Sequence, residues 1–413
     1  MATLTYRTAG ESHGPALIAL VEGMPAGVPV DKSFIDNELR RRQGGYGRGG
    51  RQKIEVDTAE FLTGIRRGKT IASPVTMLVK NKDSRLDDLA ATPPLHRPRP
   101  GHADLAGSVK WLTTDCRETL ERASARETAA RVAAGALARC LLRQFDIEVI
   151  GFVREVGPVR ATIPQIDGLT DNGAAKLIRQ IALSGSRKFA DEICALRDAD
   201  DLYCPDAASS ERMKDFIRKM KGDKDTAGGV VECLVVGCPI GVGSCMTWDG
   251  RLDSRIAGAV MGIQAFKGVE IGWGFECARH PGSQVHDEIF FDPSLRDTPM
   301  LGFSRDSNRA GGLEGGMTNG QPIVVRGAMK PISTLGKPLR SVDLNTKQPS
   351  EAGWERSDIS AISAAGVVME NVIAFEVARA MLEKFGGDSL IEMKANYQAF
   401  LDAARKLPFE PQA

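Results

Sequence analysis

Aromatic residues and net charge are both scarce in this sequence. Phe, Trp and Tyr make up only 6% of its 413 residues, and the formal net charge is +1. Proteins that bind nucleic acids usually offer aromatic stacking surfaces or many cationic contacts with phosphates, so these scarcities argue against a nucleic-acid partner. No apolar run approaches the roughly 20 residues that a membrane-spanning helix needs. We therefore expect a soluble protein without a membrane segment, in which any anion site is local.

Cys-x-x-Cys pairs and a standard zinc motif are also missing, and no secretory leader is expected. The eight cysteines include no Cys-x-x-Cys pair, and residues 1–7 have no apolar stretch behind a basic one. One short segment holds four side chains of metal-ligand type: Cys277, His280, His286 and Asp287. Their spacing matches no standard zinc arrangement, and the Pro-Gly-Ser between them is typical of a turn. We therefore expect reduced cysteines, a cytoplasmic location and no metal site.

Short Val- and Ile-rich segments bounded by Gly or Pro occur between long apolar helices. The segments predict strands at residues 74–80, 147–154, 229–237 and 322–326. Helical spacing and end signals predict helices at residues 31–42, 124–145 and 254–267, and from 357 to Gly386-Gly387. Because regular βαβ alternation is absent, the pattern favours an α+β layered fold with helices sandwiched between sheets. The polar stretch at about 188–224 is predicted to be an exposed excursion.

Two segments imitate nucleotide-binding motifs. Residues 45–50 read Gly-Tyr-Gly-Arg-Gly-Gly and satisfy G-x-G-x-x-G, but they follow a predicted helix instead of a strand. Residues 63–70 end like a P-loop, but Thr63 stands where the first glycine is required. We expect neither a Rossmann site nor a P-loop here.

Two histidines lie in segments of restricted backbone. His13 lies in Gly-Glu-Ser-His-Gly, directly after a Thr- and Tyr-containing segment that reads as a strand, which places the imidazole at a strand end. His102 follows Pro and Gly, and Asp104 is close enough in sequence to orient or charge its ring. Each histidine has an ordinary alternative, a turn residue for His13 and a loop residue beside a surface acid for His102.

An anion site is expected where a helix begins near residue 124. The sequence Arg-Ala-Ser-Ala-Arg at 122–126 brings two guanidiniums, a hydroxyl and free backbone N–H groups to that helix end. The alternative is a capping box, in which Ser124 and Glu127 merely begin the helix. Arg-Ser-Asp at 356–358 repeats the arrangement, and capping alone would explain Asp358.

Basic and glycine-rich loops complete the candidate features. Arginines concentrate in one glycine-rich segment: Arg40, Arg41, Arg42, Arg48 and Arg51. That segment fits a lid over a polyanion, or alternatively an RNA-binding strip. The glycine-rich run 311–320 fits close backbone approach to a ligand, or a compound turn between strands. Residues 330–334, Lys-Pro-Ile-Ser-Thr, set a cation and two hydroxyls on a rigid turn.

Taken together, these segments resemble the chorismate synthase family. The matching signatures are the Gly-Glu-Ser-His-Gly start, the Arg-Ala-Ser-Ala-Arg-Glu-Thr-Ala-Ala-Arg helix and the Arg-Ser-Asp-Ile-Ser-Ala-Ile segment, in that order. The resemblance implies elimination of phosphate from 5-enolpyruvylshikimate 3-phosphate to give chorismate, with reduced FMN required although there is no net redox change. It also implies one domain over residues 1–413, a β-α-β sandwich with long central helices, and a homotetramer.

The resemblance also implies roles for individual residues. His13 would be the acid that assists phosphate departure, His102 would protonate or stabilise the reduced flavin, and Asp358 would act near the flavin N5. Flavin contacts would come from Arg122, Ala123, Ser124, Gln264, Ala265, Gly315, Lys330, Pro331, Ile332, Ser333, Thr334 and Arg356. Substrate or NADPH contacts would come from Ser12, Arg42, Arg48 and Arg126. Ala123 departs from the serine that the family often has there, which removes a side-chain contact.

Two other functions and the source of electrons stay open at this point. An RNA-binding protein would use the arginine-rich segment, and a flavin reductase or another true oxidoreductase would consume NADPH without releasing phosphate. For the elimination itself, the protein would reduce its FMN with NADPH or depend on an external flavin reductase.

Overall fold

An antiparallel sheet near the N-terminus forms the first layer. The computed structural model describes residues 3–49, 56–171, 173–355 and 357–407. The strands of this sheet are ordered β1-β2-β6-β3, with bounds β1 (Thr5–Ala9), β2 (Ala16–Glu22), β6 (Val75–Lys80) and β3 (Glu60–Phe61). Alternate residues of β2 and β6 are buried, as expected for a sheet with one face on the core. That inner face packs against the helices of the next layer.

A five-stranded antiparallel sheet forms the opposite layer. Its order is β10-β15-β9-β7-β8, with bounds β10 (Phe266–Ile271), β15 (Ile323–Met329), β9 (Gly229–Val236), β7 (Glu148–Val156) and β8 (Val159–Arg160). Strand β7 is buried along almost its whole length. This follows because a central helix covers one face and α7 (Ser186–Asp198) covers the other.

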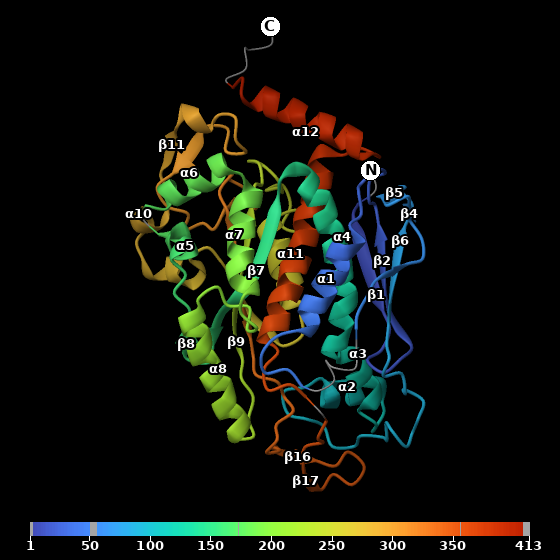
Figure 1. Ribbon diagram of the computed structural model, residues 1–413. Helices are drawn as coiled ribbons and strands as arrows, with labels where there is room; N and C mark the ends of the chain where they lie inside the picture. Colours follow the sequence, from blue (N-terminus) through green and yellow to red (C-terminus); the bar gives the residue numbers. More distant parts are fainter. Residues whose placement is uncertain (1–2, 50–55, 172, 356, 408–413) are drawn as a thin grey trace.

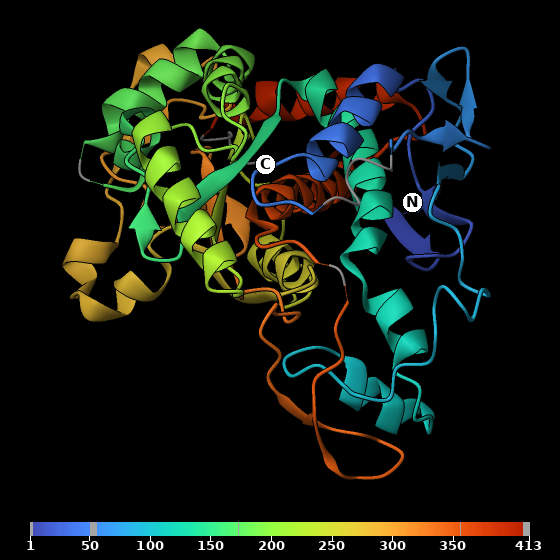
Figure 2. The same ribbon diagram turned by 60° about the horizontal axis from the view of Figure 1, so that its bottom comes forward.

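Helices that pack on one another lie between the two sheets (Figures 1 and 2). They are α1 (Lys32–Gln43), α4 (Thr128–Leu142), α9 (Leu252–Met261) and α11 (Ile362–Phe385). Helices α4 and α11 approach closely at Gly135, where an added Cβ would lie 2.2 Å from the carbonyl oxygen of Asn371. Almost every residue of both helices is buried, which explains their apolar sequences. The arrangement confirms the predicted α+β fold with helices between antiparallel sheets.

A cluster of buried charges lies inside the helical layer. Glu38 and Glu370 accept ion pairs from three arginines: Arg41, Arg139 and Arg197. The Glu370 carboxylate is fully buried, so its charge depends on these partners. The cluster joins α1, α4, α7 and α11 around one polar centre.

The remaining elements surround this three-layer core. The other helices are α2 (Asp104–Trp111), α3 (Arg117–Ala123), α5 (Pro164–Asp167), α6 (Ala174–Ser184), α8 (Ala207–Gly222), α10 (Gly282–Val285) and α12 (Leu390–Ala404). Short hairpins are β4 (Ile65–Arg66) with β5 (Lys69–Thr70), β11 (Ile289–Phe291) with β12 (Phe303–Arg305), β13 (Leu313–Glu314) with β14 (Met317–Thr318), and β16 (Arg340–Val342) with β17 (Pro349–Glu351).

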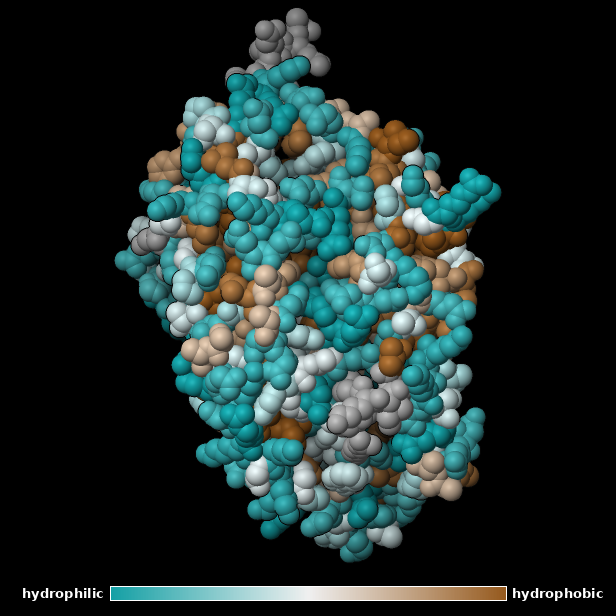
Figure 3. Space-filling view, in the orientation of Figure 1, coloured by the Kyte–Doolittle hydropathy of each residue, from teal (hydrophilic) through white to brown (hydrophobic). Residues whose placement is uncertain are grey.

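The surface seen in the orientation of Figure 1 is mostly hydrophilic, and its apolar side chains form scattered patches (Figure 3). The polar stretch 188–224 forms most of α7 and all of α8, and each helix buries an inner face through residues such as Phe189 and Met213. No helix in the described part of the chain is long and apolar enough to cross a membrane.

Two predicted helix boundaries were wrong. The helix expected to run to residue 267 ends at Met261, because Ala265 takes a left-handed conformation (φ 70°) before β10 begins. The helix expected from residue 357 begins at Ile362. The backbone N–H groups of Ile359 and Ser360 donate instead to the carbonyl of Gly47, which fixes that stretch as a loop.

Candidate active site

A pocket of about 620 Å³ opens where α4 and α11 begin. Its wall combines the turn after β1, the end of α1, the α3–α4 junction, the α9–β10 turn, the end of β15 and the segment before α11. These parts lie far apart in the sequence. The pocket is therefore a product of the layered fold and not of one local motif.

Most of the predicted site residues line this one pocket. They are Ser12, His13, Arg42, Arg48, His102, Ala123, Ser124, Arg126, Gln264, Ala265, Lys330, Pro331, Ile332, Ser333, Thr334 and Asp358. Two predicted residues are placed elsewhere. Arg122 turns its guanidinium to the carbonyls of Thr8 and Gly10, and Gly315 forms the β13–β14 turn in the run 311–320. Arg356 lies outside the described residues.

The N-terminal ends of two central helices meet at the pocket. Ser124 begins the first of them: its Oγ accepts a hydrogen bond from Arg126 N, and a single 3₁₀ turn leads into α4. Glu127 does not complete a capping box, because its carboxylate binds Arg131, Thr8 and Gln264. Ala361, at the start of α11, lines the same pocket. Both helix dipoles therefore favour an anion here.

His13 is held between two carboxylates that the sequence did not single out. Its Nδ1 lies 2.8 Å from Glu121 Oε1, and its Nε2 lies 3.7 Å from Asp83 Oδ2. Although burial opposes ionisation, the hydrogen bond with His13 holds the pKa of Glu121 below its ordinary value. A buried histidine paired in this way is suited to carry a proton.

His102 belongs to a second hydrogen-bonded group in the wall of the same pocket. Its Nδ1 is hydrogen-bonded to the fully buried Asp104. Arg99 Nε donates to the same carboxylate over 2.8 Å, and Arg99 Nη1 donates to Thr334 Oγ1 over 3.0 Å. Although burial opposes ionisation, the hydrogen bonds from His102 and Arg99 hold the pKa of Asp104 well below its ordinary value. The predicted orienting role of Asp104 thus has a geometric basis, while Arg99 was missed.

Arg42 and Arg126 share one buried carboxylate. Asp57 Oδ2 lies 2.8 Å from Arg42 Nη2 and 2.6 Å from Arg126 Nη1. Burial, followed by the like charge of Arg126, lowers the pKa of Arg42 to about 10, so the group stays charged at neutral pH. Although burial opposes ionisation of Asp57, the charge of Arg42 and the hydrogen bond from Arg126 hold its pKa below the ordinary value. One carboxylate against two guanidiniums leaves a net positive charge at the pocket wall.

Arg42 and Arg48 of the arginine-rich segment line this site, whereas Arg40 is exposed. Arg41 and Arg42 are buried in ion pairs, and Arg48 Nη1 lies 2.8 Å from Asp358 Oδ2. Buried guanidiniums cannot reach nucleic-acid phosphates, so Arg41 and Arg42 do not support the RNA-binding alternative. Arg51 lies outside the described residues.

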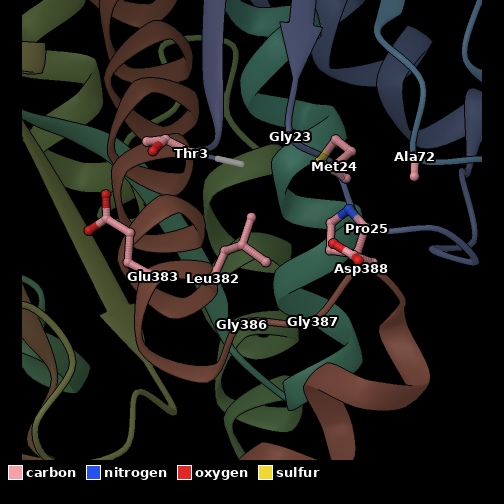
Figure 4. A pocket seen from close by; sticks show the side chains of 10 residues that line it. All are labelled: Thr3, Gly23, Met24, Pro25, Ala72, Leu382, Glu383, Gly386, Gly387 and Asp388. Atoms are coloured by element: carbon pink, nitrogen blue, oxygen red, sulfur yellow. The ribbon is translucent and has the colours of Figure 1, made fainter. Parts of the chain in front are cut away.

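A second cavity differs from this site in size and in the chemistry of its wall. A cavity of about 190 Å³ lies at the other end of α11, where Thr3, Met24 and Leu382 form part of a wall without His, Arg or Lys (Figure 4). Within the described ranges, no three or more His, Cys, Asp or Glu side chains are grouped to hold a metal ion. Asp287 instead accepts backbone N–H groups of Arg309 and Ala310.

Comparison with known proteins agrees with this geometry. The family model described as chorismate synthase matches residues 4–382. The chorismate synthase of Desulforamulus reducens is 50% identical over 413 residues, which cover 98% of this chain and 100% of that protein. The chorismate synthase of Geobacter sulfurreducens is 51% identical, covering 97% of this chain and 99% of that protein. A crystal structure of chorismate synthase superposes with a TM-score of 0.75 at 38% identity, covering 98% of this chain and 99% of that one. The chain belongs to the chorismate synthase family.

Proposed function

We propose that this protein catalyses the anti-1,4-elimination of phosphate from 5-enolpyruvylshikimate 3-phosphate, giving chorismate with no net redox change. As a member of its family it is an enzyme, a carbon–oxygen lyase that acts on phosphates in the shikimate pathway. The observation that carries the proposal is the pocket in which His13, His102 and a set of arginines converge on two helix N-termini.

The charge of the pocket suits a substrate with a phosphate and carboxylates. Arg42, Arg48, Arg126 and Lys330 line the pocket together with the two helix N-termini. Guanidiniums bind phosphate and carboxylate groups through paired hydrogen bonds, which fixes both position and orientation. We assign Arg42, Arg48, Arg126 and Ser12 to the substrate side.

His13 is assigned the proton that the leaving phosphate needs. Breaking an allylic C–O bond places negative charge on the phosphate oxygen, so a proton delivered there lowers the barrier. The imidazole lies within the pocket wall and the His13 residue is only 7% exposed, which keeps competing water away from the ring. Ser124 Oγ donates to Ser12 Oγ over 3.2 Å, so two hydroxyls lie close to the same turn.

Reduced FMN is the proposed cofactor, and the rest of the pocket fits it. The volume of about 620 Å³ lies within the usual range for cofactor sites. Among the described residues, Gln264 Oε1 and Arg42 Nε are buried polar atoms without a hydrogen-bond partner, so the wall has bonding capacity to spare. Cofactor contacts are assigned to Ala123, Ser124, Gln264, Ala265 and Lys330–Thr334. When bound, reduced flavin would lend electron density to the substrate as the C–O bond breaks and then recover it.

His102 and Asp358 are assigned to proton handling on the cofactor side. Asp104 engages His102 Nδ1, which leaves Nε2 as the ring nitrogen free of the carboxylate. A fixed tautomer of this kind suits a group that stabilises a charged partner. Asp358 is part-exposed and ionisable in the same pocket, where it can accept a proton.

The assembly, location and electron source form the finer part of the proposal. We propose a cytoplasmic homotetramer, supported by exposed apolar side chains on the β11–β12 hairpin such as Phe290 and Phe291. NADPH is proposed as the reductant, either directly at this pocket or through an external flavin reductase.

The proposed function is tested by comparing the amounts of phosphate, chorismate and oxidised flavin that form. Purified protein is given one equivalent of chemically reduced FMN and a large excess of substrate without oxygen, and phosphate, chorismate and flavin absorbance are followed together. We expect many equal equivalents of phosphate and chorismate while the flavin stays reduced. Flavin oxidation in step with product would instead indicate a true oxidoreductase, and reductant consumption without phosphate release would contradict the elimination.

A further inference from the structure

One buried carboxylate contacts both the backbone and the ring of His13. Glu121, near the end of α3, accepts the backbone N–H of His13 over 2.8 Å and contacts His13 Nδ1 over 2.8 Å and 3.1 Å. The backbone carbonyl of Glu121 also accepts the N–H of Ser12 over 3.1 Å. Its side chain is 1% exposed. A single residue, 108 positions away in sequence, therefore contacts both the backbone of the turn and the imidazole of His13.

Several other groups contact the backbone of the turn. Asn81 Nδ2 donates to the carbonyl of Gly14 over 2.7 Å and to that of Glu11 over 3.1 Å. The N–H groups of Arg85 and Leu86 donate to the carbonyl of His13. The main chain would thus stay in place without the Glu121 side chain, whereas the ring would lose its short hydrogen bond.

Two carboxylates and two arginines surround the His13 ring. The groups that face the imidazole and its partner are Glu121 and Arg117 on α3, and Asp83 and Arg85 on the segment after β6. Arg85 Nε lies 3.0 Å from Asp83 Oδ1, which offsets part of that negative charge. Glu121 is the closer carboxylate and the more deeply buried one, so its charge acts on the ring with less screening.

We propose that Glu121 is the positioning residue of the elimination, which holds the Nδ1–H of His13 and stabilises its charged ring so that Nε2–H is the acid. This inference rests on the proposed role of His13. Over the whole elimination, the Nε2–H bond breaks, an O–H bond forms on the phosphate oxygen, and the C–O bond to that oxygen breaks. A ring C–H bond also breaks, its electron pair forms the new C=C bond, and its proton passes to the side of the pocket where Asp358 lies. The ring is left neutral with its proton on Nδ1, hydrogen-bonded to Glu121, and Nε2 is ready to be protonated again. A histidine with the opposite tautomer would present a lone pair to Glu121, which a carboxylate opposes.

The experiment compares Glu121→Gln and Glu121→Asp with Glu118→Gln, which removes an exposed carboxylate from the same helix. Glutamine retains a hydrogen-bond acceptor but not the charge, so we expect kcat to fall by about tenfold or more with KM nearly unchanged. Loss of the negative charge at position 121 also disfavours the imidazolium form of His13. In Glu121→Gln, the descending limb of the pH–rate profile, where the rate falls as pH rises, should therefore move to lower pH by about one unit. Aspartate keeps the charge and should keep that limb in place, and Glu118→Gln should match the unchanged protein.

Two outcomes would overturn the inference. One is a Glu121→Gln enzyme with the original kcat and pH profile, and the other is a loss of kcat that is equal at every pH, which a purely structural role would give. Should the variant not fold, histidine ¹⁵N spectra of the unchanged protein provide the test. We expect neutral His13 to carry its proton on Nδ1. A neutral His13 with its proton on Nε2 would refute the inference. If the unchanged protein makes no chorismate, the proposed function fails, whereas activity that does not depend on Glu121 defeats only this inference.

Discussion

Arg48 Nη1 lies 2.8 Å from Asp358 Oδ2, and the backbone N–H of Gly49 donates to the other oxygen of the same carboxylate. This pair ties the loop after α1 to the segment that leads into α11. Asp358 therefore has a structural role, holding this loop, in addition to its proposed chemical role. Experiments can separate these two roles.

Replacing Asp358 with alanine should separate flavin binding from chemistry. The cofactor contacts proposed elsewhere in the pocket remain, so FMN affinity should change by less than about threefold. The chemical step should slow by about 100-fold because a proton-transfer group is lost. Flavin titration and single-turnover absorbance measure the two effects. A fully active variant would restrict Asp358 to holding the loop.

Replacing His13 with alanine should lower kcat far more than substrate affinity. General acids contribute about 10²- to 10⁴-fold, and the arginines that bind the anion are untouched. Steady-state kinetics would show the split. His286→Ala, at an exposed histidine outside the pocket, serves as the control and should behave like the unchanged protein. An unchanged rate constant in His13→Ala would remove His13 from the acid role.

Asp104 should stabilise the fold in a pH-dependent way. Its pKa is lowered in the folded protein, so its contribution is complete above the unfolded value of about 4 and is lost as the pH falls further. Asp104→Asn leaves the buried Arg99 without its carboxylate, which should cost about 3 kcal/mol at pH 7. Denaturant unfolding from pH 7 to pH 3 should show this difference shrinking below pH 4. A difference that is constant over that range would argue against the ionised pair.

Asp57 should be needed to hold the two substrate arginines together. Asp57→Asn leaves Arg42 and Arg126 buried and facing each other without a compensating charge, so unfolding free energy should fall by about 3 kcal/mol. Because the freed guanidiniums would gain an anion, inorganic phosphate should raise the melting temperature more in the variant than in the unchanged protein. Equal shifts in both proteins would mean that the arginines do not face the anion site.

Local signals in the sequence predicted most of the architecture and much of the pocket. Val- and Ile-rich runs located β6, β7, β9 and β15, and helical spacing located α1 and α4. Asp104 was recognisable because it lies two residues after His102. The start of α11 was misplaced because a hydrogen bond from Ile359 to Gly47, a long-range contact, overrides the local capping pattern.

The partners of the proposed catalytic groups were not predictable in the same way. Glu121 and Asp57 come from segments far from His13 and Arg126 in the chain, and in isolation each resembles an ordinary surface acid. Only the folded layers bring them within 3 Å of their partners. Pairing between a buried carboxylate and a distant cation produces no periodic pattern in the sequence. These partners could therefore be identified only from the three-dimensional structure.

The central claim is that one pocket unites a phosphate site with a reduced-flavin site. The most direct measurement is chorismate formation by the purified protein without oxygen, with substrate and either reduced FMN, oxidised FMN or no flavin. We predict rapid formation with reduced FMN and none in the other two mixtures. No chorismate with reduced FMN, or equal rates in all three mixtures, would contradict the account.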